Sequence, residues 1–128
     1  MEFQRSYTGT PWESEVGYCR ALRAGNLVFV TGTAPVEPDG SVHAPGDAEA
    51  QTRRCLEIID GALLEVGADR RDVVRTRMFV TDATRWREYG RAHKEFFEGH
   101  DPTTSLVEVR SLIDPAMLVE IEVDAVCG

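Results

Sequence analysis

Three carboxylates stand at every second position near the end of the chain: Glu120, Glu122 and Asp124. Alternate residues of a β-strand lie on the same face, so these acids would share one side of a strand over 118–126. A partly desolvated carboxyl group beside a substrate nitrogen or a water molecule can act as a general acid or base. A surface or interface salt bridge is the alternative for Glu120, and from the residues alone we favour that alternative.

Two arginines, Arg75 and Arg77, share one side of a second predicted strand over 72–80. The other side of this strand is mostly apolar, as is the side of 118–126 that lacks the acids. If those apolar sides pack against helices, the remaining face of the sheet carries two arginines and three acids. These charges then meet water, or they pair with opposite charges on another subunit.

The histidines and cysteines predict neither a metal site nor a redox site. No two of the three histidines stand at metal-ligand spacing with a third donor, so we predict no bound metal. The cysteines are odd in number and form no C-x-x-C pair. We expect Cys19 to face the helices, Cys55 to be buried and Cys127 to be exposed. His93 falls on the apolar stripe of a predicted helix, which favours a hydrogen-bonded core histidine over a catalytic one.

Seven elements are predicted to position these side chains. Bulky and β-branched residues predict a hairpin of strands at 18–22 and 27–31, followed by a Pro- and Gly-rich loop at 35–46. Apolar residues at three- and four-residue steps predict two helices, one from a cap at Asp47 to Gly67 and one around 86–97. The remaining strands are 72–80, 105–109 and 118–126, the last two joined by a turn around Asp114-Pro115.

The order β-β-α-β-α-β-β predicts an α+β fold, in which one mixed sheet carries both helices on a single face. Length and composition agree with one globular domain over residues 1–128. The formal net charge of −8 argues against nucleic acid as a partner, since nucleic-acid binders present basic faces. We find no leader segment and no membrane-length apolar run, and we expect a cytoplasmic protein with reduced thiols.

Several separate stretches resemble the RidA (YjgF, L-PSP) family in order and spacing, over about 17–125. They are Gly17-Tyr18, Leu27-Val28-Phe29-Val30-Thr31-Gly32, Gln51-Thr52-Arg53-Arg54-Cys55-Leu56-Glu57, Val73 to Asp82, Phe96-Phe97 and Val119-Glu120-Ile121-Glu122. The resemblance implies a chorismate-mutase-like fold assembled as a homotrimer, with three small-molecule clefts between subunits. It also implies hydrolysis of reactive imines and enamines to keto acids and ammonia, without a metal or cofactor.

The resemblance also implies roles for individual residues. Glu120 matches a glutamate that positions or activates water, and Tyr18 and Gly32 match positions close to the ligand. Trp86 falls where the family tends to have an aromatic residue at the cleft wall. Thr104 occupies the position of an arginine that grips the substrate carboxylate. A hydroxyl group supplies no fixed positive charge, so this departure favours a different, uncharged substrate.

Arg77 and Arg20 are the candidates to replace the missing charge. Arg77 shares a sheet face with Glu120 by strand alternation, and Arg20 follows Tyr18 by two residues. The alternative is that Arg77 only pairs with acids across the sheet or a subunit contact, and we favour this alternative.

Two functions remain open at the level of sequence. The first is a cofactor-free hydrolase or deaminase that acts on a small imine, enamine or related carbonyl compound, with Glu120 positioning water. The second is a non-catalytic or regulatory member that binds a small metabolite or a partner through the same clefts. A ribonuclease is disfavoured by the acidic charge and by the lack of a basic, aromatic stripe.

Overall fold

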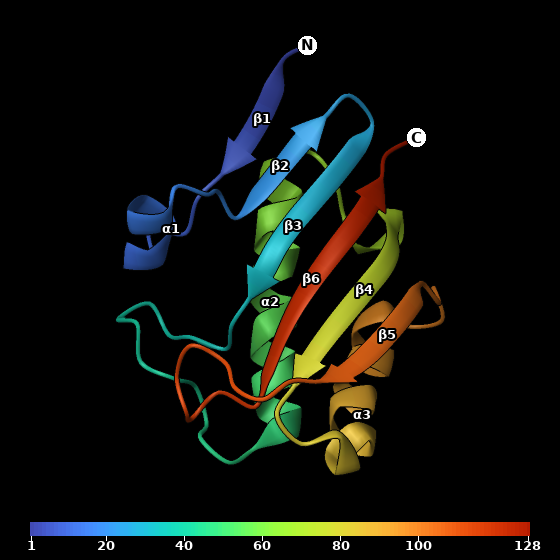
Figure 1. Cartoon of the computed structure of the whole chain (residues 1–128). Helices are drawn as coiled ribbons and strands as arrows, with labels where there is room; N and C mark the ends of the chain where they lie inside the picture. The colour runs from blue at the N-terminus through green and yellow to red at the C-terminus, as the bar shows by residue number, and fades with distance from the viewer.

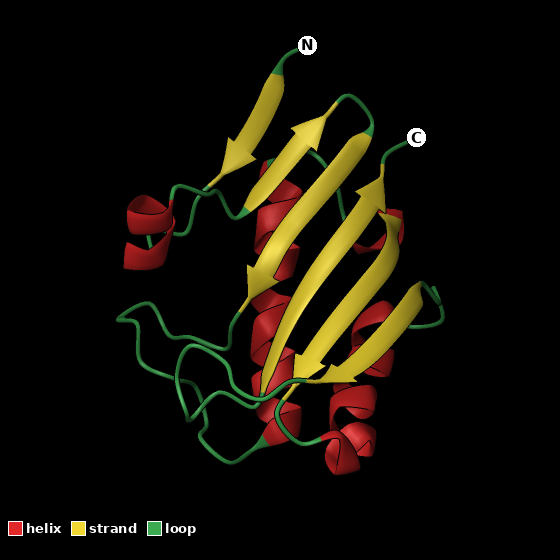
Figure 2. Cartoon of the chain, in the orientation of Figure 1, coloured by secondary structure: helices red, strands yellow, loops and turns green.

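The computed structural model describes residues 1–128 as a six-stranded mixed sheet with two long helices on one face (Figures 1 and 2). The strand order across the sheet is β1-β2-β3-β6-β4-β5. The elements are β1 (Phe3–Ser6), α1 (Pro11–Val16), β2 (Ala21–Ala24), β3 (Leu27–Thr33), α2 (Ala48–Glu65), β4 (Val73–Val80), α3 (Trp86–Phe97), β5 (Thr103–Glu108) and β6 (Val119–Val126), with short 3₁₀ turns η1 (Arg70–Asp72) and η2 (Ala83–Arg85). The predicted α+β class and the placement of both long helices on one face are confirmed.

The core lies between the sheet and the helices α2 and α3. The apolar stripe of α2 is buried along its length, as its periodicity predicts, and packs on the inward side of β6 and β3. Along β6 the burial alternates, so that Val119, Ile121, Val123 and Ala125 are buried while the acids between them are only partly so. The other face of the sheet has no helix over it (Figure 1).

The last strand in sequence is central in space. β6 pairs antiparallel with both β3 and β4, whereas β5 pairs parallel with β4 at the edge of the sheet. The segments 105–109 and 118–126, which the sequence joins by a turn, are therefore not neighbours. The helix α3 supplies the crossover that a parallel β4–β5 pair requires.

Two short elements precede the seven predicted ones. β1 pairs with β2 as an edge strand, and its exposed residues show no apolar alternation. α1 has only six residues, too few for a helical period to be visible. Its ends nevertheless carry cap signals, with Thr10 capping the N-terminus, Pro11 in the first turn and Gly17 in the left-handed region at φ 87°.

Two irregularities shift residues from their expected faces. Residues 18–20 lie outside β2, so Cys19 lines the open side of the sheet instead of facing the helices. The β4–β6 register shifts between Val73 and Arg75, which leaves Val74 exposed instead of packed. Cys127, expected to be exposed, is buried, and its thiol lies 3.9 Å from a carboxylate oxygen of Asp72.

None of the helices combines the length and apolar character required to cross a bilayer.

Candidate functional site

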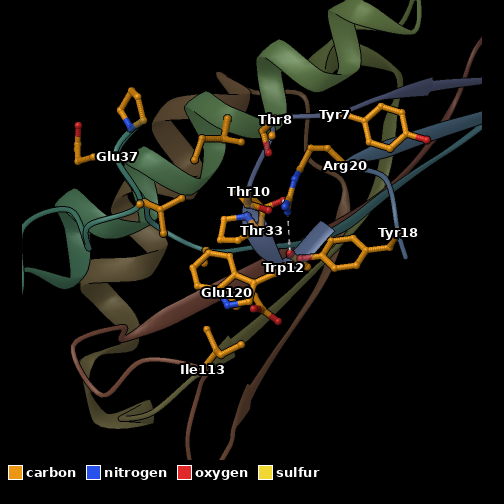
Figure 3. A pocket seen from close by; sticks show the side chains of 18 of the residues that line it. Tyr7, Thr8, Thr10, Trp12, Tyr18, Arg20, Thr33, Glu37, Ile113 and Glu120 are labelled. Atoms are coloured by element: carbon orange, nitrogen blue, oxygen red, sulfur yellow. Dashed lines mark hydrogen bonds between the residues drawn. The ribbon is translucent and has the colours of Figure 1, made fainter. Parts of the chain in front are cut away.

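A cavity of 760 Å³ opens where the N-terminal segment meets the end of β3 (Figure 3). Its walls come from residues 7–12 around the start of α1, from the loop after β3 at 34–40, and from one side of α2. Four residues singled out by sequence or resemblance line it together: Tyr18, Arg20, Gly32 and Glu120. Segments that are far apart in the sequence thus line the same cavity as the carboxyl group of Glu120.

Glu120 reaches this cavity because Gly32 leaves room for it. The β3–β6 register shifts between Val30 and Thr33, so the β3 backbone departs from regular pairing beside Glu120. A Cβ atom at Gly32 would lie 2.6 Å from Oε2 of Glu120 and 3.0 Å from its Cδ. Only glycine permits this close approach.

Burial raises the pKa of Glu120 above its ordinary value of 4.5, although the positive charge of Arg20 acts in the opposite direction. The nearby negative charge of Glu122 raises this pKa further. A carboxyl group whose pKa lies above the ordinary range holds and releases a proton closer to neutral pH. Glu120 therefore has the electrostatic character of a general acid or base.

Arg20 is buried beside Glu120, with an exposed fraction of 5%. Its Nη1 donates to the carbonyl oxygen of Gly32 at 3.0 Å and to the hydroxyl of Thr33 at 3.4 Å. Its Nη2 lies 2.9 Å from Oε2 of Glu13, and its guanidinium lies 5.7 Å from the centre of the Tyr18 ring. The Nε atom is buried without a hydrogen-bond partner.

Glu13 on α1 is the fixed partner of Arg20. Its carboxylate accepts hydrogen bonds from the backbone of Thr8 and Gly9 and from the hydroxyls of Thr8 and Thr10. Burial by itself would raise the pKa of Glu13, but the hydrogen bonds from Thr8 and Arg20 outweigh it and bring the pKa to about 2. Sequence reasoning missed Glu13, because it missed the helix that carries it.

Aromatic and aliphatic side chains form the rest of the wall around Glu120. Trp12 projects from α1 toward the carboxyl group, and Tyr18 and Ile113 approach from other sides (Figure 3). Of the two aromatic residues that the sequence singled out, Tyr18 lines this cavity and Trp86 does not, and Trp12 is a further aromatic residue of the wall. The cap signals at Thr10 and Gly17 are the features of the sequence from which α1, and hence Trp12, could have been predicted.

Trp86 and Thr104 lie elsewhere in the subunit. Trp86 begins α3, is 52% exposed and stacks against the guanidinium of Arg87. Thr104 lies on the edge strand β5, where its hydroxyl accepts from Thr76 at 2.6 Å. Thr76 in turn lies 2.9 Å from Nε2 of His93, which gives that histidine the core hydrogen bond expected of it. Neither Trp86 nor Thr104 lines the Glu120 cavity of its own chain.

Arg77 belongs to a different hollow, of 730 Å³, on the open face of the sheet. Its Nη1 lies 3.0 Å from Glu122 and 3.4 Å from Asp124, and Arg75 lies 3.2 Å from Asp124. These cross-strand pairs match the ion-pair interpretation of Arg77. Within one chain, Arg20 and not Arg77 is the arginine next to Glu120.

No three His, Cys, Asp or Glu side chains in residues 1–128 are grouped so as to hold a metal ion. The ionisable groups of the cavity are carboxylates and guanidinium groups. Four carboxylates line it, those of Glu37, Asp39, Glu65 and Glu120, against the two arginines Arg20 and Arg54. The cavity is therefore acidic, in keeping with the net charge of the chain.

Comparison with known proteins identifies the family of this chain. A family model described as endoribonuclease L-PSP matches residues 9–127. The chain belongs to the L-PSP family. The crystal structure of Rv2704 from Mycobacterium tuberculosis, a member of the YjgF/YER057c/UK114 family, is similar with a TM-score of 0.89 and 46% identity, over 98% of this chain and 99% of that one.

Two curated proteins are similar to this chain over most of their length. The uncharacterized protein SCO2049 of Streptomyces coelicolor is 36% identical over 125 residues, which are 98% of this chain and 92% of that protein. The 3-aminoacrylate deaminase RutC of Acinetobacter baylyi is 34% identical over 104 residues, which are 81% of this chain and 82% of that one. The matches agree with the resemblance drawn from the sequence stretches.

Proposed function

We propose that this L-PSP-family protein hydrolyses a small reactive imine or enamine in the Glu120 cavity, without a cofactor. The observation that carries the proposal is the Glu120 carboxyl group, which is held against Gly32 beside a buried arginine and has a raised pKa. The similarity to a deaminase, RutC, supports the same reaction class.

The reaction requires only water and a group that moves a proton. Glu120 in its ionised form accepts a proton from water while the water oxygen forms a bond to the imine carbon, and the C=N π electrons move to nitrogen. The nitrogen takes that proton from Glu120, which completes a carbinolamine. Glu120 then accepts the proton of the new hydroxyl group and passes it to the nitrogen, so that the C–N bond breaks as the C=O bond forms and ammonia leaves. Water supplies the oxygen of that product, and an enamine enters the same sequence after tautomerising to the imine.

The assembly that we propose is a homotrimer, in which neighbouring copies complete the cavity. The open sheet face carries Leu27 and Phe29, each more than two fifths exposed, beside the paired charges of Arg77 and Glu122. Such a mixture of apolar and complementary charged groups is suited to contact with another copy. Thr104, Trp86 and the open edge of β5 are then available to line a cleft from the neighbouring subunit.

A non-catalytic role in binding a small metabolite is the second candidate. Thr104 favours it, because the resemblance places a carboxylate-gripping arginine at that position. In this case the cavity retains its ligand and Glu120 serves as a hydrogen-bond partner instead of a proton carrier. Ligand binding without turnover would distinguish this candidate from the enzyme.

Cleavage of RNA appears in the description of the matching family, and we do not propose it for this chain. The net charge is −8 and the cavity lining is acidic, so a phosphate backbone would be repelled. Cleavage of RNA by the purified protein, lost in Glu120→Gln, would overturn this judgement.

Replacement of Glu120 by glutamine tests the proposed reaction. Imines are generated in situ by an amine or amino-acid oxidase, and their decay is followed by competition with semicarbazide. We expect the wild type to accelerate hydrolysis and Glu120→Gln to lose at least 10²-fold of that acceleration, the typical contribution of general acid–base catalysis. Glu15→Gln is the matched control, because Glu15 is exposed and lies outside the cavity. Equal activity of wild type and Glu120→Gln would contradict the proposed role.

A further inference from the structure

We infer that the cavity selects imines that carry no carboxylate group. This inference rests on the proposed function and specifies its substrate class. It follows from the charges already present around Arg20, the one buried guanidinium group in the cavity wall.

The positive charge of Arg20 is already shared between two carboxylates. Glu13 contacts it directly at 2.9 Å, with both side chains at most 6% exposed. Glu120 is held within its electrostatic reach, since Arg20 lowers the pKa of that carboxyl group. A substrate carboxylate would be a third anion around a single cation, and it would lose its hydration on entering the cavity.

Within one chain, the rest of the lining holds one other cation, and that cation already has partners. Arg54, the second arginine of the wall, donates its Nε to the carbonyl oxygen of Val36 at 2.8 Å and lies 3.3 Å from Glu57. Three further carboxylates face the same cavity, from Glu37, Asp39 and Glu65. Their combined field repels an anionic ligand and attracts a protonated nitrogen compound, and it does not exclude a neutral one.

The remaining contacts suit a ligand with an apolar substituent or a cationic nitrogen. Trp12, Tyr18 and Ile113 provide apolar surface, and aromatic faces also attract cations. Arg20 retains a buried Nε donor without a partner. Because that nitrogen is covered, it is not exposed to a ligand, and the aromatic and aliphatic side chains supply the contact surface for an uncharged one.

Three probes of one size and three charges test the inference by direct binding. Phenylacetamide is neutral, phenethylamine is cationic and phenylacetate is anionic, and calorimetry on the intact protein gives the affinity of each. We expect phenylacetamide or phenethylamine to bind at least tenfold more tightly than phenylacetate. Tightest binding of phenylacetate overturns the inference, whether or not the protein is an enzyme.

A single substitution should reverse this selectivity. Glu13→Gln removes the direct partner of Arg20 and leaves its charge for a ligand, so we expect the affinity for phenylacetate to rise at least tenfold relative to phenylacetamide. Glu15→Gln is the matched control, because Glu15 is an exposed residue on the same helix and the change in net charge is identical. No gain in Glu13→Gln with a retained fold, judged by circular dichroism, contradicts the inference. If that variant does not fold, the three-probe series on the wild type decides.

Turnover separates this inference from the proposed function. The imine that an amino-acid oxidase forms from phenylalanine is compared with the imine that an amine oxidase forms from phenethylamine, because the two differ by one carboxylate. We expect at least tenfold greater acceleration for the imine without the carboxylate. Equal or greater acceleration for the imino acid overturns the inference and leaves the hydrolase standing. Acceleration of neither contradicts the hydrolase, while the binding series still decides the charge preference.

Discussion

The close approach of Gly32 to Glu120 predicts what happens when one methyl group is added at position 32. In Gly32→Ala the new Cβ would lie 2.6 Å from the Glu120 carboxylate, so the carboxyl group must move away from its position in the cavity. We expect imine hydrolysis, or ligand affinity if the protein does not catalyse, to fall at least tenfold. Oxidase-coupled kinetics and calorimetry measure the two quantities.

Gly61→Ala is the control for this substitution. Gly61 lies within α2, and a Cβ there would meet nothing within 4 Å. We expect this variant to keep full activity and to gain about 0.5–1 kcal/mol in the free energy of unfolding, because alanine has the better helix propensity. If Gly32→Ala also kept full activity, the tight approach at Gly32 would have no functional importance.

Arg20 is expected to set the pH at which Glu120 ionises. The pKa of Glu120 is raised by burial and lowered by Arg20, so removal of the guanidinium in Arg20→Gln raises this pKa further. If ionised Glu120 is the base, activity rises as pH increases through its pKa, and the acidic limb of the pH–rate profile moves to higher pH in Arg20→Gln. An unchanged limb would contradict this coupling. Arg75→Gln should leave the limb in place, since Arg75 pairs with Asp124 outside the cavity.

At the scale of elements, α1 is attached to the sheet by a titratable group. Glu13 has a pKa of about 2 in the folded chain against an ordinary value of 4.5, so its ionised form stabilises the fold above pH 4.5. This stabilisation, on the order of 3 kcal/mol, is lost as pH falls from 4.5 toward 2. We expect the wild type to lose more unfolding free energy over that range than Glu13→Gln does, as measured by urea titration. Parallel losses in the two proteins would contradict a stabilising role of the ionised Glu13.

The elements that the sequence predicted well are those whose pattern of apolar residues repeats over many positions. The stripe of α2 and the alternation of β6 extend over many residues, so burial follows the pattern. β1 and α1 were missed because a strand of four residues, three of them exposed, and a helix of six residues have no apolar side long enough to recognise. The parallel β4–β5 pair was missed because strand pairing across α3 depends on packing and not on local sequence.

Individual residues of the candidate site could be predicted from the sequence, but which of them lie together could not. Strand alternation correctly put Arg77 on the face of Glu120, yet Arg77 lies nearest Glu122 and Asp124 in another hollow. Arg20 acts on Glu120 instead, because its guanidinium donates to the carbonyl oxygen of Gly32, the residue against which the Glu120 carboxyl group lies. Side-chain alternation predicts which face a residue takes only within a regular strand. The candidate site residues lie beside the irregular stretch of β3, where that rule no longer holds.

For the whole molecule, the uncovered sheet face predicts association of identical copies. We expect a particle mass near three times 14.2 kDa by light scattering. Phe29→Glu places a charge at the centre of that face and should reduce the mass toward one copy, because burying an unpaired carboxylate is costly. Leu64→Glu, on an exposed position of α2, should keep the larger mass. A wild type of 14.2 kDa in solution would contradict the proposed trimer.

The wall of the cavity formed by residues 7–16 is largely separate from the hydrophobic core. It is anchored through the pairing of β1 with β2 and the contact of Glu13 with Arg20, and none of its residues belongs to the core cluster. Exchange of this segment between relatives would therefore change the side chains facing a ligand while leaving the packing of sheet and helices intact. A chimaera bearing a relative's N-terminal segment is therefore a direct route to a new ligand preference on the same scaffold.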